Sequence, residues 1–546
     1  MVRTDTSSDL DALVKPNPQP PTATRPRQFW SADESRPIWT LPACLALQLI
    51  LFSTLAYSRM IDTDEGLYLL AIKLVAQGKR PYLDFFYQQM PGLPYVYALW
   101  SRAVGLSWTS ARLLSVLLSV TLGGLIYWHI ERLYSRKSLA CLGVLLYALN
   151  NLVLAWHTVV KTYALSNLLL FCAYLLVFPE AKRASLWKAF LGGLLLALAV
   201  DTRLYLIGVA PVLMASLYYT GSRAGGRLRH VGSFVGGLAL GLLPNLVFLS
   251  RSLDNYIFDN LGYHLIRDDA SFADERRQRL RTFLSITNIQ GSYDGAGPQF
   301  ALLSLPAFAT VVSRQLDRRL FFPLAMGLAL FVICLVPSPT FPQYFCVCVP
   351  YMVIVAVGFM ATVARSLEVG DEARRLLRAF GWLIAGIYVS CGILTFYNYD
   401  FSATGVEGVM SRYNRFDYRI ATVRQVSKEL RHWAANDEPV LSFWPGYVAE
   451  CDCVPIEGTE NDFGLRVSHK LSAAKADQYK LMTDQGVQDL IKRHYPRVVV
   501  VGTVSGAMVP LGENWWIEYR DLLRRNGYQL ARAIGRTEIY LRTSPQ

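Results

Sequence analysis

The stretch DTDEGLYLLA, residues 62–71, lies just beyond residues 39–58, an apolar block without a charged side chain. Further blocks of the same kind occur at 189–200, 231–249, 321–336 and 344–364. Their lengths approach the roughly 20 residues that a helix needs to cross a bilayer. Charged residues make up only 17% of the 546 residues, against about 25% in average soluble domains. The composition indicates a polytopic α-helical membrane protein, and it excludes a cytosolic enzyme, a nucleic-acid-binding protein and a disordered chain.

The distribution of basic residues predicts the topology. We expect a disordered cytoplasmic tail at 1–38 and a transmembrane domain at 39–397. The predicted spans, eleven in all, are 39–58, 110–130, 138–156, 162–178, 186–201, 204–220, 231–249, 298–313, 319–336, 341–364 and 378–397. Basic residues cluster in alternate connections, such as the one with Arg132, Arg136 and Lys137, and such connections face the cytoplasm. The long loops 59–109 and 250–297 and the C-terminal residues 398–546 are then extracytoplasmic.

The two long outer loops are predicted to carry helices. Residues Glu65–Gly78 have apolar side chains at helical spacing, which predicts an amphipathic helix lying along the membrane surface. In the second loop, the charged stretch IRDDASFADERRQRLR (266–281) predicts a solvated helix, and the glycine-rich residues after it predict a mobile segment. Loops of this length on one face are seldom mere connections.

Residues 398–546 are predicted to form a small α/β domain. Helical patterns and β-rich runs alternate in the order 417–435, Pro439–Phe443, 484–494, Arg497–Gly502 and Glu538–Arg542. The domain shows no phosphate-binding glycine pattern, zinc-ligand spacing or nucleophile elbow, so we expect it to bind or to cover a site. Cys451 and Cys453 are separated by one residue, a spacing that suits neither an ordinary disulfide nor a common zinc site.

Asp62, Asp64 and Glu65 place three carboxylates where the first span reaches water. A carboxylate in this position can take a proton from a hydroxyl, and several together can hold a divalent cation such as Mg²⁺ or Mn²⁺. A structural role is the alternative, because Thr63 or Asp64 can cap the following helix and Glu65 can complement its dipole. Spacing alone leaves both roles open.

Three motifs follow one another in the first part of the chain: DTDEGLYLLA at 62–71, PYLDFFYQQMPGLPY at 81–95 and SARLLS at 110–115. In this order they resemble the opening of the GT-C glycosyltransferases of the protein-O-mannosyltransferase and aminoarabinose-transferase type. The resemblance covers 59–120 well and continues more weakly to residue 364. It implies the GT-C fold and an inverting transfer of a monosaccharide from a polyprenyl-phosphate carrier to an acceptor hydroxyl on the outer face.

The resemblance also implies roles for residues of these motifs. Asp64 would be the general base on the acceptor hydroxyl, and Glu65 would support it or join Asp64 in binding a divalent metal ion. Arg112 matches the family's arginine at the start of the second span and would face the carrier's phosphate, for which a guanidinium is well shaped. The alternative for Arg112 is an arginine that extends to the membrane interface.

Further candidates for substrate binding lie at the outer ends of later spans. Lys161 and His157 share one helical face, where family members often carry an arginine or an acidic residue, and we expect Lys161 to contact the phosphate. Arg203 fits the family's basic residue between two spans, although Asp201 could simply pair with it. Gln343 replaces the family's frequent histidine or arginine, so it is expected to form hydrogen bonds without proton transfer. The remaining candidate substrate-binding residues are Tyr82, Asp84 and Tyr344.

Two other classes of function compete with the transferase. A transporter or lipid flippase would also need many spans, although we find no internal repeat of the kind common in transporters. A non-catalytic assembly scaffold would leave the acidic motif as a helix cap. The expected partners of the transferase are a polyprenyl-phosphate-linked sugar, a lipid, glycan or protein acceptor, and membrane lipids, with no nucleic acid. The absence of an endoplasmic-reticulum retention signal favours a bacterial plasma membrane.

Overall fold

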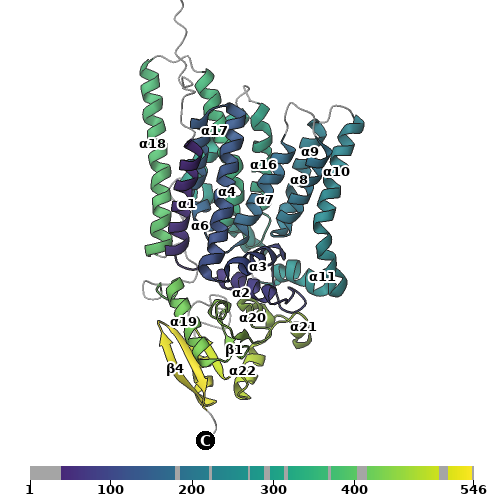
Figure 1. Ribbon diagram of the computed structural model, residues 1–546, viewed down its shortest axis with the longest axis vertical. Coiled ribbons are helices and arrows are strands. Elements are labelled where there is room, and N and C mark those ends of the chain that lie inside the picture. The colour runs from purple at the N-terminus through teal and green to yellow at the C-terminus, as the bar shows by residue number, and fades with distance from the viewer. Residues whose placement is uncertain are drawn as a thin grey trace, which may run out of the picture.

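The computed structural model describes residues 39–178, 185–220, 224–267, 271–287, 296–312, 318–366, 371–402, 415–502 and 515–543. The predicted tail at 1–38 and the glycine-rich residues 288–295 lie outside these ranges. Figure 1 shows three layers along the long axis of the molecule. A bundle of long helices comes first, short helices cross one end of the bundle, and a small α/β domain follows beyond them.

The bundle contains the apolar helices that the sequence predicts. Its members are α1 (Thr40–Ser58), α4 (Trp108–Tyr134), α5 (Lys137–Ala148), α6 (Asn151–Trp156), α7 (Thr162–Val177), α8 (Leu186–Val200), α9 (Ala210–Thr220), α10 (Ala224–Leu242), α15 (Ala296–Val312), α16 (Arg318–Cys334), α17 (Val349–Ser366) and α18 (Asp371–Phe396). Within the described ranges, five stretches are long and apolar enough to cross a membrane: Thr40–Ser58, Trp108–Tyr134, Gly226–Arg251, Pro342–Thr362 and Ala379–Ser402. Shorter apolar helices occupy the other predicted positions. The membrane class is supported, and the number of crossings stays a prediction.

Four of the predicted spans are interrupted within the described residues, and in 231–249 a 3₁₀ turn, Leu243–Asn245, follows α10. In the span predicted at 138–156, the side chain of Asn150 accepts hydrogen bonds from the N–H groups of Leu152 and Val153 at 3.1 and 3.3 Å, which ends one helix and starts another. The spans predicted at 204–220 and 341–364 begin with 3₁₀ turns, Leu204–Val209 and Pro342–Cys348. The apolar composition of a span does not reveal where its helix is interrupted. The interruptions place polar loops at one end of the bundle.

The short helices across the end of the bundle come from the two long outer loops, except Leu246–Arg251, which continues the predicted span 231–249. They are α2 (Glu65–Ala76), α3 (Gly92–Val104), α11 (Leu246–Arg251), α12 (Leu253–Ile257), α13 (Tyr263–Ile266) and α14 (Phe272–Thr287). The prediction that α2 exposes a polar face is wrong, because every residue from Glu65 to Val75 is buried. The C-terminal domain covers that face. A Cβ atom on Gly66 would lie 2.7 Å from the ring of Trp444, so this close contact requires glycine.

The C-terminal domain is a five-stranded sheet with helices around it. Its elements are α19 (Ile420–Trp433), β1 (Pro439–Ser442), β2 (Val454–Pro455), α20 (Asp462–Ser468), α21 (Ala473–Gln478), α22 (Asp484–Lys492), β3 (Val498–Val501), α23 (Trp515–Arg525), β4 (Tyr528–Ile534) and β5 (Thr537–Arg542). The strand order is β2-β1-β3-β5-β4, with β1 parallel to β2 and β3, and β5 antiparallel to β3 and β4. Every predicted strand and helix of this region occurs at its expected place, whereas β2, α20, α21, α23 and β4 were not predicted.

The domain contacts the rest of the protein through buried aromatic and polar groups. The indole rings of Trp444 and Trp108 stack with their centroids 5.9 Å apart. The Trp444 Nε1–H also donates to the carbonyl of Thr63, at 2.9 Å, which links the domain directly to the acidic motif. The aromatic segment 442–447 is therefore a packed strand end.

Lys73 of α2 fixes a second part of this contact. Its Nζ donates to the carbonyls of Val448, Cys451 and Cys453 at 2.9, 2.7 and 2.7 Å. Burial lowers the pKa of Lys73 to about 8. Cys451 and Cys453 form a disulfide, which corrects the expectation drawn from their spacing. The Lys73 ammonium thus ties the loop closed by this disulfide to α2.

Replacing Lys73 with methionine is expected to loosen this loop. The change leaves three buried carbonyls without their donor, so we expect a local stability loss of about 2 kcal/mol. Hydrogen–deuterium exchange of the amides at 448–453 measures it, and exchange should accelerate more than tenfold. Lys79→Met, at a half-buried lysine just after α2, is the matched control. Equal protection of the amides at 448–453 from exchange in both variants would contradict a role of Lys73 in holding this loop.

Candidate functional site

The acidic motif lies where α1 gives way to α2, and its three carboxylates have different surroundings. Glu65 is the first residue of α2 and forms a fully buried ion pair with Arg112 of α4. Arg112 Nε and Nη2 lie 2.8 and 2.5 Å from the two Glu65 oxygens. The backbone N–H groups of Asp62 and Val160 donate to the same carboxylate at 2.9 and 3.0 Å. All of the hydrogen-bonding capacity of Glu65 is therefore directed inward.

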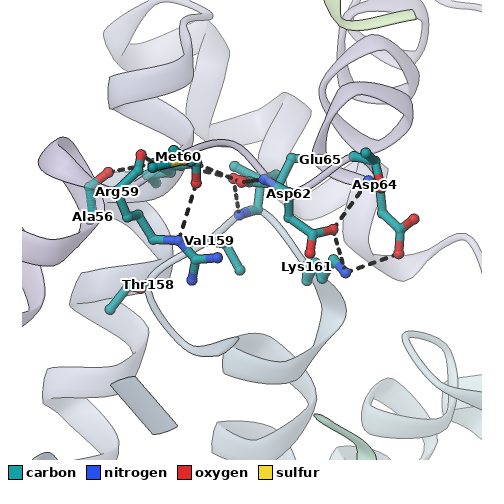
Figure 2. A network of polar contacts seen from close by, with 12 residues as sticks. Ala56, Arg59, Met60, Asp62, Asp64, Glu65, Thr158, Val159 and Lys161 are labelled. Atoms are coloured by element: carbon teal, nitrogen blue, oxygen red, sulfur yellow. Dashed lines mark hydrogen bonds and ion pairs between the residues drawn. The ribbon is translucent and has the colours of Figure 1, made fainter. Parts of the chain in front are cut away.

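Lys161 joins the other two carboxylates. It lies in the loop between α6 and α7, and its Nζ is 2.6 Å from Asp62 Oδ1 and 2.9 Å from Asp64 Oδ2. Figure 2 shows the ammonium reaching between the two aspartates, with Glu65 on the other side of the motif. The Asp62 side chain is buried, whereas that of Asp64 is 27% exposed. Asp64 Oδ1 makes no hydrogen bond among the residues that the structure describes.

The exposed side of Asp64 faces a cavity of about 410 Å³. The cavity lies among the acidic motif, the second outer loop, the start of the 3₁₀ turns in the bundle and the C-terminal domain. Among its described lining residues are four cations and one carboxylate: Lys161, Arg203, Arg267, Arg466 and Asp64. The lining also includes the predicted residues Gln343 and Tyr344. A cavity with this charge suits an anionic ligand whose phosphate meets the cations and a hydroxyl group that meets Asp64.

Aromatic rings hold Arg203 in place. Its guanidinium carbon lies 4.1 Å from the centroid of the Tyr163 ring and 5.2 Å from those of Tyr205 and Tyr344. Its Nη1 donates to the Tyr205 hydroxyl at 2.8 Å. Asp201 does not pair with Arg203 and instead accepts a hydrogen bond from Asn245 at 2.7 Å. The stacked guanidinium keeps its charge directed at the cavity.

Burial shifts the pKa values of several acids and bases of the site. Burial raises the pKa of Asp64, and Lys161 opposes this effect by stabilising the carboxylate. Burial and then the charge of Asp64 raise the pKa of Asp462 to about 8, so Asp462 is mostly protonated near neutral pH. Burial, followed by Arg267, lowers the pKa of His264 to about 4, so this histidine is neutral. Asp64 is the one carboxylate among the described residues that line the cavity.

Part of the cavity wall was not anticipated from the sequence. Arg267 and His264 come from the second outer loop, and Arg466 and Phe463 come from α20. Arg267 donates to the Ser338 carbonyl at 2.7 Å, which fixes it against the loop before α17. The charged stretch 266–281 contains Arg267, but its composition suggested only a solvated helix. No sequence signal pointed to Arg466.

Several predicted site residues lie away from the cavity. Arg112 binds Glu65 instead of facing an open site, since both side chains are completely buried. His157 is buried and bonds with Tyr147 at 3.0 Å through Nδ1. Asp84 pairs with Arg80 at 2.9 Å. These three residues, with Tyr82 and Glu65, are not among the described residues that line the cavity. Their side chains meet other protein groups, and the roles that we expected for them stay predictions.

Tyr82 illustrates why. Its hydroxyl donates to the Gln89 carbonyl at 2.6 Å, and its ring packs against Phe248 and Tyr256 with centroid distances of 5.2 Å. The aromatic segment 82–87 thus joins the two outer loops to each other. These contacts give Tyr82 a packing role between the outer loops.

The predicted metal site does not fit these residues. Both oxygens of Glu65 are already engaged by Arg112 and by backbone N–H groups. Asp64 is bound to an ammonium, which repels a cation. Within the described parts of the chain, no group of three histidine, cysteine or acidic residues is arranged to hold a metal ion. No step below therefore involves a metal.

Comparison with known proteins supports a fold assignment. No protein-family model and no curated protein sequence matches the chain. ArnT from Cupriavidus metallidurans bound to undecaprenyl phosphate is similar over 93% of this chain and 99% of that chain, with a TM-score of 0.64 and 14% identity. An Archaeoglobus fulgidus oligosaccharyltransferase tethered with an acceptor peptide is similar over 93% of this chain and 74% of that chain, with a TM-score of 0.50 and 13% identity. These are GT-C superfamily glycosyltransferases, and this chain has the GT-C fold.

Proposed function

We propose that this protein is a membrane glycosyltransferase that moves a monosaccharide from a polyprenyl-phosphate carrier to an acceptor hydroxyl. The observation that carries the proposal is the cavity in which one accessible carboxylate, Asp64, lies among Lys161, Arg203, Arg267 and Arg466. A carboxylate can serve an acceptor hydroxyl while the cations bind a phosphate. ArnT, which shares the fold, has been captured with undecaprenyl phosphate.

The reaction is a direct displacement at the anomeric carbon. The acceptor oxygen forms a new bond to this carbon, and the bond from the carbon to the phosphate oxygen breaks with inversion. The acceptor proton passes to Asp64, and the bonding electrons leave with the phosphate, which gains one negative charge. Arg203, Arg267 and Arg466 are the groups of this chain that would stabilise that charge.

The second oxygen of Asp64 supports this division of labour. Oδ2 is held by Lys161 at 2.9 Å, so the carboxylate has a fixed direction and Oδ1 remains for the acceptor. A positioned base of this kind contributes about 10²–10⁴-fold to the rate. The acceptor would be a lipid, a glycan or a protein that approaches from the aqueous side, and the donor would enter from the bilayer.

We place the cavity on the extracytoplasmic face of a bacterial plasma membrane. Helix α4 begins at Trp108, at the end of the bundle where the cavity lies, and ends at Tyr134. The basic connection with Arg136 and Lys137 follows Tyr134. Positive connections of this kind face the cytoplasm. The cavity at the opposite end of α4, together with the C-terminal domain, would then face outward, with the N-terminus in the cytoplasm.

Turnover of a donor panel tests the proposal. Purified protein in nanodiscs is incubated with radiolabelled polyprenyl-phosphate sugars and with candidate lipid, glycan and peptide acceptors. Release of polyprenyl phosphate together with a labelled product is the expected result. Movement of intact donor between leaflets with no bond cleavage would instead support a flippase, and it would contradict the transferase.

Loss of a cavity arginine is expected to weaken donor use. Each charge-assisted hydrogen bond contributes about 1.5–3 kcal/mol, so Arg203→Ala and Arg267→Ala should each reduce kcat/KM by roughly 10–100-fold. Arg203→Lys keeps the charge but loses the planar stack on Tyr163, so it should recover activity only in part.

An arginine away from the cavity provides the control. Arg229→Ala removes an exposed arginine of α10 and should leave kcat/KM near that of the unmodified protein. Steady-state release of polyprenyl phosphate over a range of donor concentrations gives these values. Equal losses in Arg203→Ala and Arg229→Ala would mean that the cavity charges do not bind the donor.

A further inference from the structure

We propose that the Lys161 side chain is a built-in replacement for a divalent cation, so that this site works without a metal ion. The inference rests on the proposed function for the role of Asp64 as base. Its structural part, the exclusion of a cation from the acidic motif, can be tested without any turnover.

The first argument is occupancy. Lys161 Nζ lies within hydrogen-bond distance of one oxygen from each of two aspartates, 2.6 Å from Asp62 and 2.9 Å from Asp64. Two carboxylates two residues apart would otherwise present oxygens to one hard cation, as Mg²⁺ and Mn²⁺ prefer. An ammonium and a metal ion cannot share this position, because they would overlap and repel each other (Figure 2).

The second argument is that Lys161 is confined. Its side chain is only 4% exposed, and its Nζ lies 4.7 Å from the centroid of the Trp156 ring. The Lys161 backbone N–H donates to the Val159 carbonyl at 2.9 Å, which shapes the loop immediately before α7. A buried ammonium that left its two carboxylates would forgo their compensation for its lost hydration. The lysine is thus a fixed part of the site.

The third argument concerns the remaining ligands. A metal ion held by Asp62 and Asp64 would need further oxygen or nitrogen ligands. Glu65, the nearest acid in sequence, already accepts four hydrogen bonds from Arg112 and two backbone N–H groups. His264 faces the Gln88 carbonyl at 3.1 Å. The potential metal ligands Glu65 and His264 therefore bind other groups of the protein, and the Lys161 ammonium occupies the position between Asp62 and Asp64.

The ammonium also performs the electrostatic task of such a cation. Burial lowers the pKa of Lys161, and the charges of Asp62 and Asp64 outweigh this effect and hold the pKa above its ordinary value. Lys161 therefore remains charged and favours the ionised form of Asp64, whose pKa burial raises. Asp64 needs that ionised form to accept a proton. Lys161 is in this sense a positioning residue for the base.

Binding of Mn²⁺ tests the exclusion of a metal directly. Electron paramagnetic resonance of Mn²⁺ titrated into the protein in nanodiscs reports bound and free ion. We expect the unmodified protein to leave the free-ion signal as it is in empty nanodiscs. Lys161→Asp adds a third carboxylate in place of the ammonium, and it should bind Mn²⁺ stoichiometrically, with binding lost when Asp64→Asn is added.

Two outcomes of this titration overturn the proposal. One is stoichiometric Mn²⁺ binding by the unmodified protein that Asp64→Asn abolishes. The other is a folded Lys161→Asp variant that binds no Mn²⁺, because the ammonium would then not stand at a cation position. If Lys161→Asp does not fold, Mn²⁺ binding by the unmodified protein, compared with that by Asp64→Asn, still tests whether the site excludes a metal ion.

Activity supplies the second readout. Release of polyprenyl phosphate by the unmodified protein should change by less than about twofold after exhaustive chelation with EDTA, and loss of activity that Mg²⁺ restores would contradict the proposal. Failure of every donor would reject the proposed function, while the Mn²⁺ titration would still decide on Lys161.

The pH profile separates a positioning role from a merely structural one. The charged and titratable groups around Asp64 are Asp62, Tyr68, Lys161, Arg203, Tyr263, Arg267 and Asp462. Removing the ammonium in Lys161→Met should raise the pKa of Asp64, so turnover falls off at a higher pH. Lys161→Arg should restore the original profile, and Lys188→Met, at an exposed lysine of α8, should not shift it. A uniform loss of turnover without a shift would contradict the role.

Discussion

Asp64→Asn is expected to lower turnover of the donor by about 10²–10⁴-fold, the contribution of a positioned general base. The asparagine side chain has nearly the same shape and can still accept a hydrogen bond from Lys161, but it cannot take the acceptor proton. Residual release of polyprenyl phosphate should persist, because the cavity cations still bind the phosphate. Steady-state turnover of purified, folded protein is the measurement.

Asp62→Asn is the matched control, because it removes the other carboxylate that contacts Lys161. Asp62 is buried and does not line the cavity, so its loss should reduce turnover far less than that of Asp64. Equal losses in the two variants would indicate that both residues serve only to hold Lys161. Full activity of Asp64→Asn would leave the acidic motif as a structural turn.

The pH dependence of the unmodified protein has a definite sign. A general base works in its deprotonated form, so turnover must fall as the pH drops through the pKa of Asp64. Burial raises that pKa, and Lys161 only partly opposes the effect. The loss of activity on acidification should therefore begin at a higher pH than for an ordinary, solvated carboxyl group.

Breaking the Glu65–Arg112 pair is expected to have the largest effect on stability. Removing one member of a buried ion pair costs about 3–5 kcal/mol, because the other charge is left without compensation. Glu65→Gln should fall in this range, since an amide presents N–H groups where Arg112 and two backbone groups also donate. Urea or thermal unfolding in detergent, followed by tryptophan fluorescence, gives the change in free energy.

The double variant Glu65→Gln/Arg112→Met tests whether the cost comes from the uncompensated charge. Removing both charges should be less destabilising than adding the two single effects, with a coupling of up to about 3 kcal/mol. Additive effects would show that the two side chains do not act as a pair. A Glu65→Gln variant that folds normally but has no turnover would indicate that Glu65 takes part in the reaction and does not only stabilise the fold.

Much of the architecture follows from the sequence, because long apolar blocks and strand-like runs have few alternative structures. The apolar helices, the strands β1, β3 and β5 of the C-terminal domain and the acidic motif at the end of α1 were placed by such local patterns. Asn150 shows the limit: one polar side chain ends a helix inside an apolar block, and its effect depends on where its oxygen points. The buried face of α2 shows the same limit, since only the docked domain reveals that Lys73 has carbonyl partners.

The composition of the site was harder to foresee, for an electrostatic reason. Asp64, Arg112 and Arg203 were candidates because their motifs resemble those of the GT-C glycosyltransferases, and Lys161 because it lies at the outer end of a span. A buried charge such as Arg112 needs a partner, however, and Glu65 lies 47 residues earlier in the chain. Which charge is compensated by the protein and which faces a cavity is a property of the tertiary structure. Arg267 and Arg466, in ordinary polar stretches, carried no local sign at all.

The contribution of α20 to the cavity has a consequence for the timing of synthesis. Phe463 and Arg466 lie in the wall opposite the bundle, yet they are made after every helix of the bundle has left the ribosome. A nascent chain that has been inserted only as far as α18 already has Asp64, Lys161 and Arg203, but its cavity lacks one side. The cavity is therefore closed on this side only after α20 has folded, so a nascent chain that ends before α20 cannot enclose a ligand there.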